Sequence, residues 1–530
     1  MSLVGMLTPF AAFAQRNDNP GRPDDIPAQV LMPEHFDKTS LPLRDMADKA
    51  LNERARGGRD FEPGRPFGIG NTNPATEKSE TPLGVGDVSA MIEPKASTNG
   101  VPVDPNARVA PPDTTGDLGP NHYVQWVNLR YAVYNLTRDA NNNITGFNAA
   151  PGFPKNGNTL FQGFGGQCES SNDGDPIVQY DQAADRWILT QFAVTRTPYL
   201  QCVAVSTSPD PTGTYYRYSY SFNKDFNDFP KMGIWNDNYV ITYNIFRNGR
   251  SFNGSRVCAY ERSQMLVGGA ARQLCSTTST SYGSLLPADV EGSVNPPAGS
   301  AVPLLAITTS SLLSWRFAVN WTSGTASLTG PTTVSGVTSF SRACSGGTCI
   351  PQPGTTNKLD SLADRLNYRL SYRKFADGHE SLLVNHAVAA NSASGIRWYE
   401  LRNVTSGTLS IFQQGTFAPD SNYRWMGSAA MDKTGGIAIG YNVSSSSVSP
   451  SIRYAYRGPT DGAGLLSNET SVFAGSASQT GTLTRWGDYS TISVDPVDGC
   501  TMVFTTEYIP SNGSFNWSTF IHSFKLSTCN

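Results

Sequence analysis

The sequence has no long apolar run, little charge and few histidines. No stretch of its 530 residues reaches the roughly 18 apolar residues that a membrane-spanning helix requires. Charged residues make up only 16%, and 40 Lys and Arg nearly balance 43 Asp and Glu, so the chain lacks the basic surface typical of nucleic-acid binding. These absences predict a soluble protein without a nucleic-acid partner.

Several common catalytic motifs are also missing. The sequence contains no G-x-S-x-G elbow, no H-E-x-x-H pair, no P-loop and no G-x-G-x-x-G after a strand in a convincing context. It has five His and no C-x2-C pair, which disfavours a zinc site. The chain is therefore not an obvious esterase, metalloprotease or nucleotide enzyme.

The abundant residues are those of strands and turns. There are 50 Gly, 35 Pro, 22 Tyr and 25 Phe. Aromatic residues suit pleated strands, whereas Gly and Pro suit tight turns. This composition predicts an all-β fold.

The N-terminal hundred residues differ from the rest. Residues 1–14 contain an apolar segment that ends in Ala12-Phe13-Ala14, the small-x-small pattern of a signal peptide, although a positive n-region is missing. Residues 15–100 are rich in Pro, Gly and charge, and they are interpreted as an extended or partly disordered arm. Residues 101–530 carry the strand pattern. We expect a secreted or periplasmic protein.

A loose repeat of about sixty residues covers the region from 101 to 530. The unit opens with an acidic residue, in six of seven cases, followed by an apolar strand, a polar turn and a second apolar strand. The acidic starts are Asp117, Asp175, Asp228, Asp289, Asp364 and Asp488, and a further start lies at Arg424. The repeat predicts a single β-propeller of about seven four-stranded blades, with six or eight blades as alternatives.

Eight cysteines in an exported chain predict disulfides. Sequence alone does not determine connectivity, and the simplest scheme pairs them in order, as Cys168–Cys202, Cys258–Cys275, Cys344–Cys349 and Cys500–Cys529.

In a propeller the starts of the innermost strands converge at one opening, which would gather the acidic residues there. The set predicted to bind substrate comprises Asp117, Asp228, Lys231, Arg365, Arg424, Trp425, Arg485 and Trp486. Arginine beside tryptophan, which occurs at both Arg424 and Arg485, suits a sugar ring with carboxylate or hydroxyl groups. The competing interpretation is that each Asp caps a turn through its own backbone hydrogen bonds.

Two reactions fit such a site. Glycoside hydrolysis needs one protonated and one ionised carboxyl, for which Asp175, Asp364 and Asp488 are the candidates. Elimination from a uronic-acid polymer needs a base and a cation, for which the candidates are His122, His386, Tyr489, Arg365 and Arg424. The alternative is a non-catalytic propeller that binds glycan or protein at a surface.

Calcium is a possible ligand. Asp139-x-Asn141-x-Asn143 and Asn172-Asp173-Gly174-Asp175 resemble fragments of calcium loops, but neither has the full spacing, and ordinary hairpin turns account for the first.

The segments DTTGDLGPNHYVQWVN, LDSLADRLNYRL, YRWMGSAAMD and RWGDYSTISVDP resemble those of a group of exported bacterial propeller-like proteins over about residues 110–510. The resemblance implies export and a propeller fold, and it implies no particular reaction. Propeller glycosidases such as sialidases are a distant comparison, because their S-x-D-x-G-x-T-W turn is absent.

Overall fold

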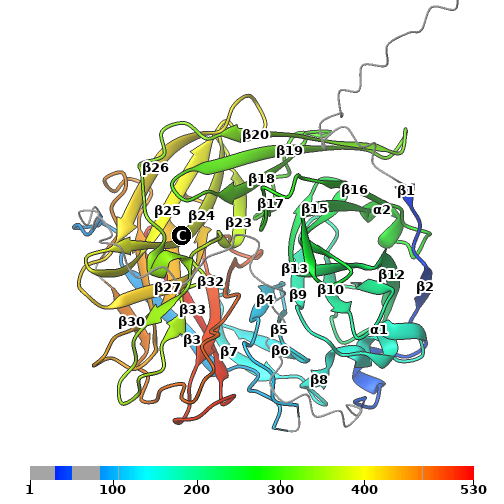
Figure 1. The fold of residues 1–530 in the computed structure, drawn as a ribbon, viewed down its shortest axis with the longest axis horizontal. Coiled ribbons are helices and arrows are strands. Elements are labelled where there is room, and N and C mark those ends of the chain that lie inside the picture. Colours follow the sequence, from blue (N-terminus) through cyan, green and yellow to red (C-terminus); the bar gives the residue numbers. More distant parts are fainter. Residues whose placement is uncertain (1–29, 50–83, 106, 468) are drawn as a thin grey trace, which may run out of the picture.

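The computed structural model describes residues 30–49, 84–105, 107–467 and 469–530. The regular secondary structure of the described residues is almost entirely antiparallel strand, and Figure 1 shows the strands arranged as sheets around a common centre. The all-β propeller predicted from the sequence is confirmed.

Three sheets form the first part of the ring. One contains β4 (Thr115–Leu118), β5 (His122–Val127), β6 (Arg130–Arg138) and β7 (Ile144–Ala149), with β8 (Lys155–Asn156) paired to β6. The next contains β9 (Ile177–Asp181), β10 (Arg186–Ala193), β11 (Tyr199–Ser206) and β12 (Tyr215–Asn223), with β2 (His35–Lys38) on its outer edge. The third contains β13 (Asp225–Trp235), β14 (Asn238–Arg247), β15 (Ser251–Glu261) and β16 (Gln273–Thr277), with β1 (Val30–Leu31) on its outer edge.

An eight-stranded sheet follows, in which two four-stranded antiparallel units are joined by parallel pairing of β17 with β23. The first unit is β17 (Leu286–Val290), β18 (Val302–Ile307), β19 (Leu312–Asn320) and β20 (Thr325–Thr333). The second is β23 (Asn367–Lys374), β24 (Glu380–Ala390), β25 (Ala393–Arg402) and β26 (Ser410–Phe417). A small hairpin, β21 (Thr348–Ile350) with β22 (Leu359–Asp360), lies in the connection between the two units.

Two further sheets complete the ring. One is β27 (Tyr423–Met431), β28 (Ile437–Ser444), β29 (Ser451–Arg457) and β30 (Thr470–Phe473). The other is β31 (Thr491–Val494), β32 (Met502–Tyr508), β33 (Ser518–Leu526) and β3 (Ile92–Asn99). The described helices are short: α1 (Gly166–Ser170), α2 (Arg262–Met265), and the 3-10 turns Leu43–Asp45, Gly157–Phe161 and Ala343–Gly346.

The innermost strands form a closed ring. In chain order, β4, β9, β13, β17, β23, β27 and β31 each contact the next, and β31 contacts β4. The last sheet draws its outer strand from the N-terminal side, because β3 pairs with the C-terminal β33. This pairing fastens the two ends of the chain together, as a closed ring requires.

The core lies between neighbouring sheets, where apolar residues of successive strands pack face to face. Its largest side chains are eight fully buried tryptophans: Trp126, Trp187, Trp235, Trp315, Trp398, Trp425, Trp486 and Trp517. Strand periodicity explains this, since alternate residues of each strand face one neighbouring sheet.

The predicted repeat coincides with this ring. Three of the acidic starts lie on innermost strands, three precede one by two or three residues, and Arg424 lies on β27. The four disulfides pair as predicted, as Cys168–Cys202, Cys258–Cys275, Cys344–Cys349 and Cys500–Cys529.

The predicted signal peptide, residues 1–14, lies outside the described residues. Within the predicted arm, residues 15–100, the described strands β1, β2 and β3 each pair with a sheet of the ring. Among the described residues, no helix combines the length and apolarity needed to cross a bilayer.

Candidate functional site

Each innermost strand begins at the same end of the ring, which we call the entry end. At or near the start of each of these strands one non-glycine residue has a positive φ, between 45° and 57°: Asp113, Asp175, Phe229, Ser284, Leu362, Met426 and Asp488. This backbone region is sparsely populated and costs energy for bulky side chains, so its recurrence marks a shared local geometry. Three of the seven positions carry an aspartate.

These three aspartates converge. The backbone N–H of Asp113 donates to the carbonyl of Gly487 at 3.0 Å, which places Asp113 beside Asp488. The backbone N–H of Asp175 donates to Asn128 Oδ1 at 3.0 Å. The carboxyls of Asp113 and Asp175 lie close together, because each shifts the pKa of the other. We call Asp113, Asp175 and Asp488 the entry-end carboxylates.

Burial raises the pKa of Asp113 well above its usual value, and the negative charges of Asp175 and Asp488 raise it further. Burial also raises the pKa of Asp175, although Lys231 and Asp113 oppose this. Of the two carboxyls, Asp113 therefore has the stronger tendency to hold a proton. Asp113 Oδ1 has no hydrogen-bond partner among the described residues. Asp175 is half-buried, whereas Asp113 and Asp488 are buried.

Lys231 supplies a positive charge beside this pair. Its Nζ lies 3.3 Å from the centre of the Phe229 ring and 3.4 Å from the centre of the Tyr489 ring, and it donates to the carbonyl of Pro230 at 2.9 Å. Burial lowers the pKa of Lys231, whereas Asp175 and the other entry-end carboxylates raise it. Tyr489 Oη donates to Asp175 Oδ2 at 3.2 Å.

Two arginines border the same cluster, each paired with a neighbouring aspartate. Arg485 forms a two-point ion pair with Asp488. Arg365 binds both oxygens of Asp364, at 2.9 and 3.0 Å, and its guanidinium lies 4.4 Å from the centre of the Phe229 ring. Burial and the entry-end carboxylates raise the pKa of Tyr489 most, and the half-buried Asp228 is close enough to raise it further.

The structure thus brings together eight of the residues predicted from the sequence: Asp175, Asp228, Asp364, Asp488, Tyr489, Lys231, Arg365 and Arg485. Sequence reasoning missed Asp113. A signal for it was present, since Asp113 precedes its strand by two residues, as Asp175 does.

Asp117 and Asp289 belong to a second, deeper cluster. Asp117, Asp289 and Glu291 surround Arg369, whose guanidinium forms an ion pair with each. All four side chains are buried, on or beside the innermost strands β4, β17 and β23. Asp117 also accepts the backbone N–H groups of Leu118 and Tyr180 at 2.8 Å, and Asp289 that of Ile234 at 2.9 Å. Because Tyr180 lies on β9 and Ile234 on β13, these carboxylates link neighbouring innermost strands, which is neither the predicted turn cap nor a substrate contact.

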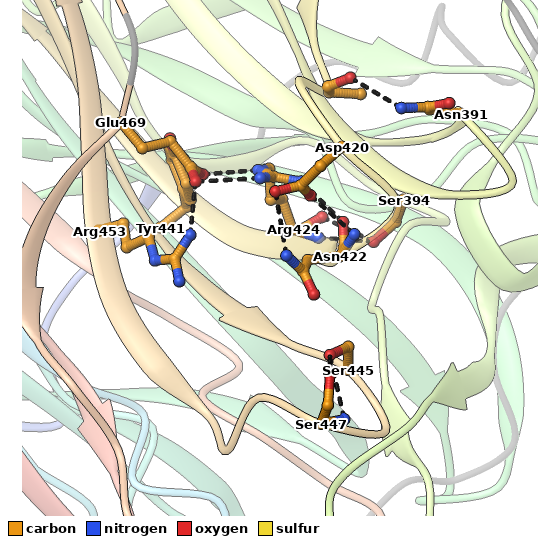
Figure 2. A network of polar contacts seen from close by, with 11 residues as sticks. Asn391, Ser394, Asp420, Asn422, Arg424, Tyr441, Ser445, Ser447, Arg453 and Glu469 are labelled. Carbon is orange, nitrogen blue, oxygen red and sulfur yellow. Dashed lines mark hydrogen bonds and ion pairs between the residues drawn. The ribbon is translucent and has the colours of Figure 1, made fainter.

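Arg424, predicted to bind substrate, is placed elsewhere. Figure 2 shows its guanidinium directed toward Glu469, at 2.6 and 3.0 Å, and Asp420, at 2.8 Å. Glu469 directly precedes the outermost strand β30 and also accepts from Tyr441 and Arg453. The guanidinium therefore ties strands of one sheet together instead of facing the ring axis.

The tryptophans next to the arginines are fully buried. Trp425 and Trp486 contact each other with ring centres 5.6 Å apart. Neither ring is available to stack on a sugar, and the pair instead packs between neighbouring units.

The two predicted histidines do not join the entry end. His122 begins β5, directly after the turn that follows β4, so it lies at the other end of that strand from Asp113. His386 lies on the second strand β24, fully buried, with Nε2 3.0 Å from Tyr399 Oη and its ring 4.6 Å from Phe340. Burial lowers the pKa of His386 to about 3, so its ring is neutral at physiological pH.

The Asp139 and Asp173 carboxylates of the calcium-like loops already accept hydrogen bonds from the protein. Asp139 Oδ1 accepts the backbone N–H groups of Asn141 and Asn143, and Asp173 accepts from Val194 and Thr195. In the part of the chain that the structure describes, no group of three or more His, Cys, Asp or Glu is arranged to hold a metal ion. An ordinary side-chain-to-backbone turn accounts for the Asp139 loop, whereas Asp173 binds the end of β10.

The site and fold together define an all-β propeller with a cluster of titratable groups at one end of its ring. No protein-family model matches the chain, and no curated protein matches it. Among solved structures, the chain is similar to an endo-arabinase from Bacteroides thetaiotaomicron, with 14% identity over 56% of this chain and 93% of that chain and a TM-score of 0.28.

It is also similar to an exo-β-1,3-galactanase from Clostridium thermocellum, with 12% identity over 68% of this chain and 78% of that chain and a TM-score of 0.29. A third similarity is to an α-L-arabinanase from Penicillium chrysogenum, with 9% identity over 81% of this chain and 98% of that chain and a TM-score of 0.32. At these identities and TM-scores the similarities carry no inference about reaction or substrate.

Proposed function

We propose that the protein is a secreted, carbohydrate-active propeller that hydrolyses glycosidic bonds at the entry end of its ring. The observation that carries the proposal is the convergence of three carboxyls, Asp113, Asp175 and Asp488, at the entry end of the ring. Acid-catalysed hydrolysis of a glycoside needs a carboxyl that keeps its proton near neutral pH and a second carboxyl that is ionised.

The roles follow from the local charges. We assign one proton to the pair of Asp113 and Asp175, because burial raises the pKa of both carboxyls, and the half-buried Asp175 is the member that a substrate can reach. The pair donates this proton to the leaving glycosidic oxygen as the bond from the anomeric carbon to that oxygen breaks. Asp488, whose negative charge Arg485 stabilises, accepts a proton from the water that attacks the anomeric carbon, so the products are two sugars with free hydroxyls.

Hydrolysis fits these residues better than elimination does. Both predicted histidine bases lie away from the entry end. The remaining candidate, Tyr489, is a poor base, because burial and the negative charge of Asp175 raise its pKa well above the usual value.

The experiment is incubation of the protein with a panel of neutral and uronic-acid polysaccharides, following new reducing ends and the ultraviolet absorbance of unsaturated products. We expect reducing ends without absorbance. Asp175→Asn should abolish this turnover, whereas Asp377→Asn, at an exposed turn after β23, serves as the control and should leave it unchanged. Absorbance from unsaturated products would instead indicate elimination, and turnover by Asp175→Asn would contradict the proposal.

One observation favours a second candidate, a non-catalytic propeller that binds glycan or protein. Asp113, Lys231 and Arg365 are only 3%, 2% and 4% exposed, which restricts access to the cluster. This candidate predicts no turnover on any polysaccharide, together with a lower melting temperature for Asp175→Asn, since losing a buried hydrogen-bond partner costs about 1–3 kcal/mol.

Secretion or a periplasmic location is part of the proposal. It is supported by the four disulfides, which persist in oxidising compartments. Detection of the protein in the culture medium or periplasm, with an N-terminus near Gln15, tests it.

A further inference from the structure

The connections at the entry end of the second and third sheets carry an unusual set of exposed cations. Because strands alternate in direction, the β10–β11, β12–β13 and β14–β15 connections all lie at the end where β9 and β13 begin. These connections expose Arg196, Lys224, Arg247 and Arg250, which we call the cationic rim.

Two carboxylates lie beside the rim, and both already have partners. Asp173 accepts hydrogen bonds from Val194 and Thr195, the residues before Arg196. Asp225, at the start of β13, lies 3.7 Å from Arg247, but its other oxygen is bound by Arg256 at 2.8 Å. By contrast, several hairpin turns at the opposite end of the ring are acidic, with Asp185, Asp237, Asp377 and Asp498 among their residues. The four rim residues are therefore a local group of exposed positive charges in a molecule whose net charge is −3.

An aromatic cluster lies directly beside the rim. Phe192, Phe226 and Phe246 are buried, and the half-buried Tyr199 and Phe252 pack on them with ring centres 5.6 Å from Phe226 and 5.5 Å from Phe246, respectively. Tyr199 and Phe252 come from different sheets, so the cluster spans the boundary between the second and third sheets.

The aromatic cluster and the cationic rim form one surface. Gly249, with φ of 68°, lies between Arg247 and Arg250 in sequence, and a Cβ at that position would be 2.7 Å from the Tyr199 hydroxyl. Tyr199 therefore rests against the turn that carries two of the four cations. The same surface reaches the proposed site, because the backbone N–H of Phe192 donates to the carbonyl of Gly174, the residue before Asp175.

We propose that this surface binds a polysaccharide chain whose sugars carry carboxylate groups and guides it to Asp175. Half-buried aromatic rings offer an apolar face to a sugar ring, and guanidinium groups pair with carboxylates in two-point geometry. The proposal rests on the proposed function and narrows its substrate to acidic polysaccharides.

The test uses polygalacturonate and its methyl-esterified form, which share one backbone and differ in charge. Affinity of the full chain is measured by calorimetry at low salt. We expect polygalacturonate to bind at least about tenfold more tightly than the esterified polymer, and its binding to weaken as salt rises. Equal affinity for the two polymers would overturn the proposal, as would tighter binding of double-stranded DNA than of polygalacturonate.

Variants locate the binding surface. The double variant Arg247→Gln/Arg250→Gln should weaken polygalacturonate binding about tenfold, and Tyr199→Ala should weaken binding of both polymers. Lys433→Gln, an exposed cation in a turn at the opposite end, and Phe412→Ala, an exposed ring on β26, are the matched controls and should bind like the parent protein. Equal losses in the control and surface variants would refute the assignment.

A further variant separates this proposal from the proposed reaction. Asp175→Asn should retain polygalacturonate binding while losing any turnover. Retained binding with no turnover by the parent protein would leave the binding surface standing and refute hydrolysis. Turnover of neutral polymers alone, with no affinity for polygalacturonate, would refute the binding surface and leave hydrolysis standing.

Discussion

The deep cluster around Arg369 makes the stability of the protein depend on pH in a way that one substitution exposes. Arg369, only 4% exposed, is paired with Asp117, Asp289 and Glu291, which are equally buried. Burial raises the pKa of Asp289 to about 6 and that of Glu291 to about 7, although Arg369 opposes both shifts. Replacing Arg369 by Met removes this opposing charge and leaves carboxyls that are costly to ionise.

Proton linkage gives the direction in which stability changes with pH. A carboxyl with a raised pKa in the folded state binds more protons when folded than when unfolded, so its contribution to stability is complete below about pH 4 and is lost as pH rises through 6 to 7. Without Arg369 the pKa values of Asp289 and Glu291 rise further, and the loss of stability at high pH becomes larger. Breaking a buried ion pair by removing one partner costs about 3–5 kcal/mol. We expect that cost at pH 8 and less than about 1 kcal/mol at pH 5, where the carboxyls are already largely protonated.

The measurement is the free energy of unfolding in urea at pH 5 and pH 8, followed by tryptophan fluorescence with the disulfides intact. Arg44→Met is the control, since Arg44 pairs with Asp210 at the surface, and exposed pairs contribute less than about 1 kcal/mol. A loss for Arg369→Met that is equal at the two pH values would refute the reasoning, because it would mean that ionisation of the carboxyls plays no part.

Two further predictions concern packing and a buried histidine. In Gly233→Ala the added Cβ would lie 2.3 Å from the Ala288 carbonyl oxygen of the neighbouring innermost strand. We expect this overlap to lower the free energy of unfolding, measured in urea, by about 1–3 kcal/mol. An unchanged free energy of unfolding would show that the two strands can separate without cost. His386→Phe should flatten the loss of stability on acidification. The pKa of His386 is lowered from 6.5 to about 3, so its neutral form stabilises the fold above pH 6.5 and this contribution falls by about 3 kcal/mol between pH 7 and pH 4. Parallel pH profiles for the two proteins would exclude this role.

The repeat and the disulfides were predictable because they depend on short-range pattern. Each unit joins a polar start to strands of alternating polarity, and this pattern placed the seven starts on or just before the seven innermost strands. Each disulfide closes a loop of 5 to 34 residues, so pairing in order was also the pairing with the shortest loops.

The direction of individual side chains was not predictable in the same way. Arg424 and Trp425 are consecutive on one strand, so their side chains leave opposite faces and cannot both point to the ring axis. The partner of Arg424, Glu469, lies 45 residues later and precedes an outer strand that the repeat pattern did not resolve. Likewise, only the fold shows that Arg369 lies among Asp117, Asp289 and Glu291, because these residues come from three different units.

The two acidic clusters show how the same residue type serves different purposes along one ring. Around Arg369, three buried carboxyls surround a guanidinium that forms an ion pair with each of them. At the entry end, Asp113 retains a buried oxygen without a hydrogen-bond partner among the described residues, and Asp175 is half-buried. The deep cluster has such an atom too, since Arg369 Nε finds no hydrogen-bond partner among the described residues. The two clusters therefore differ in access: Asp117, Asp289 and Glu291 are all buried, whereas Asp175 is half-buried and can be reached by a ligand.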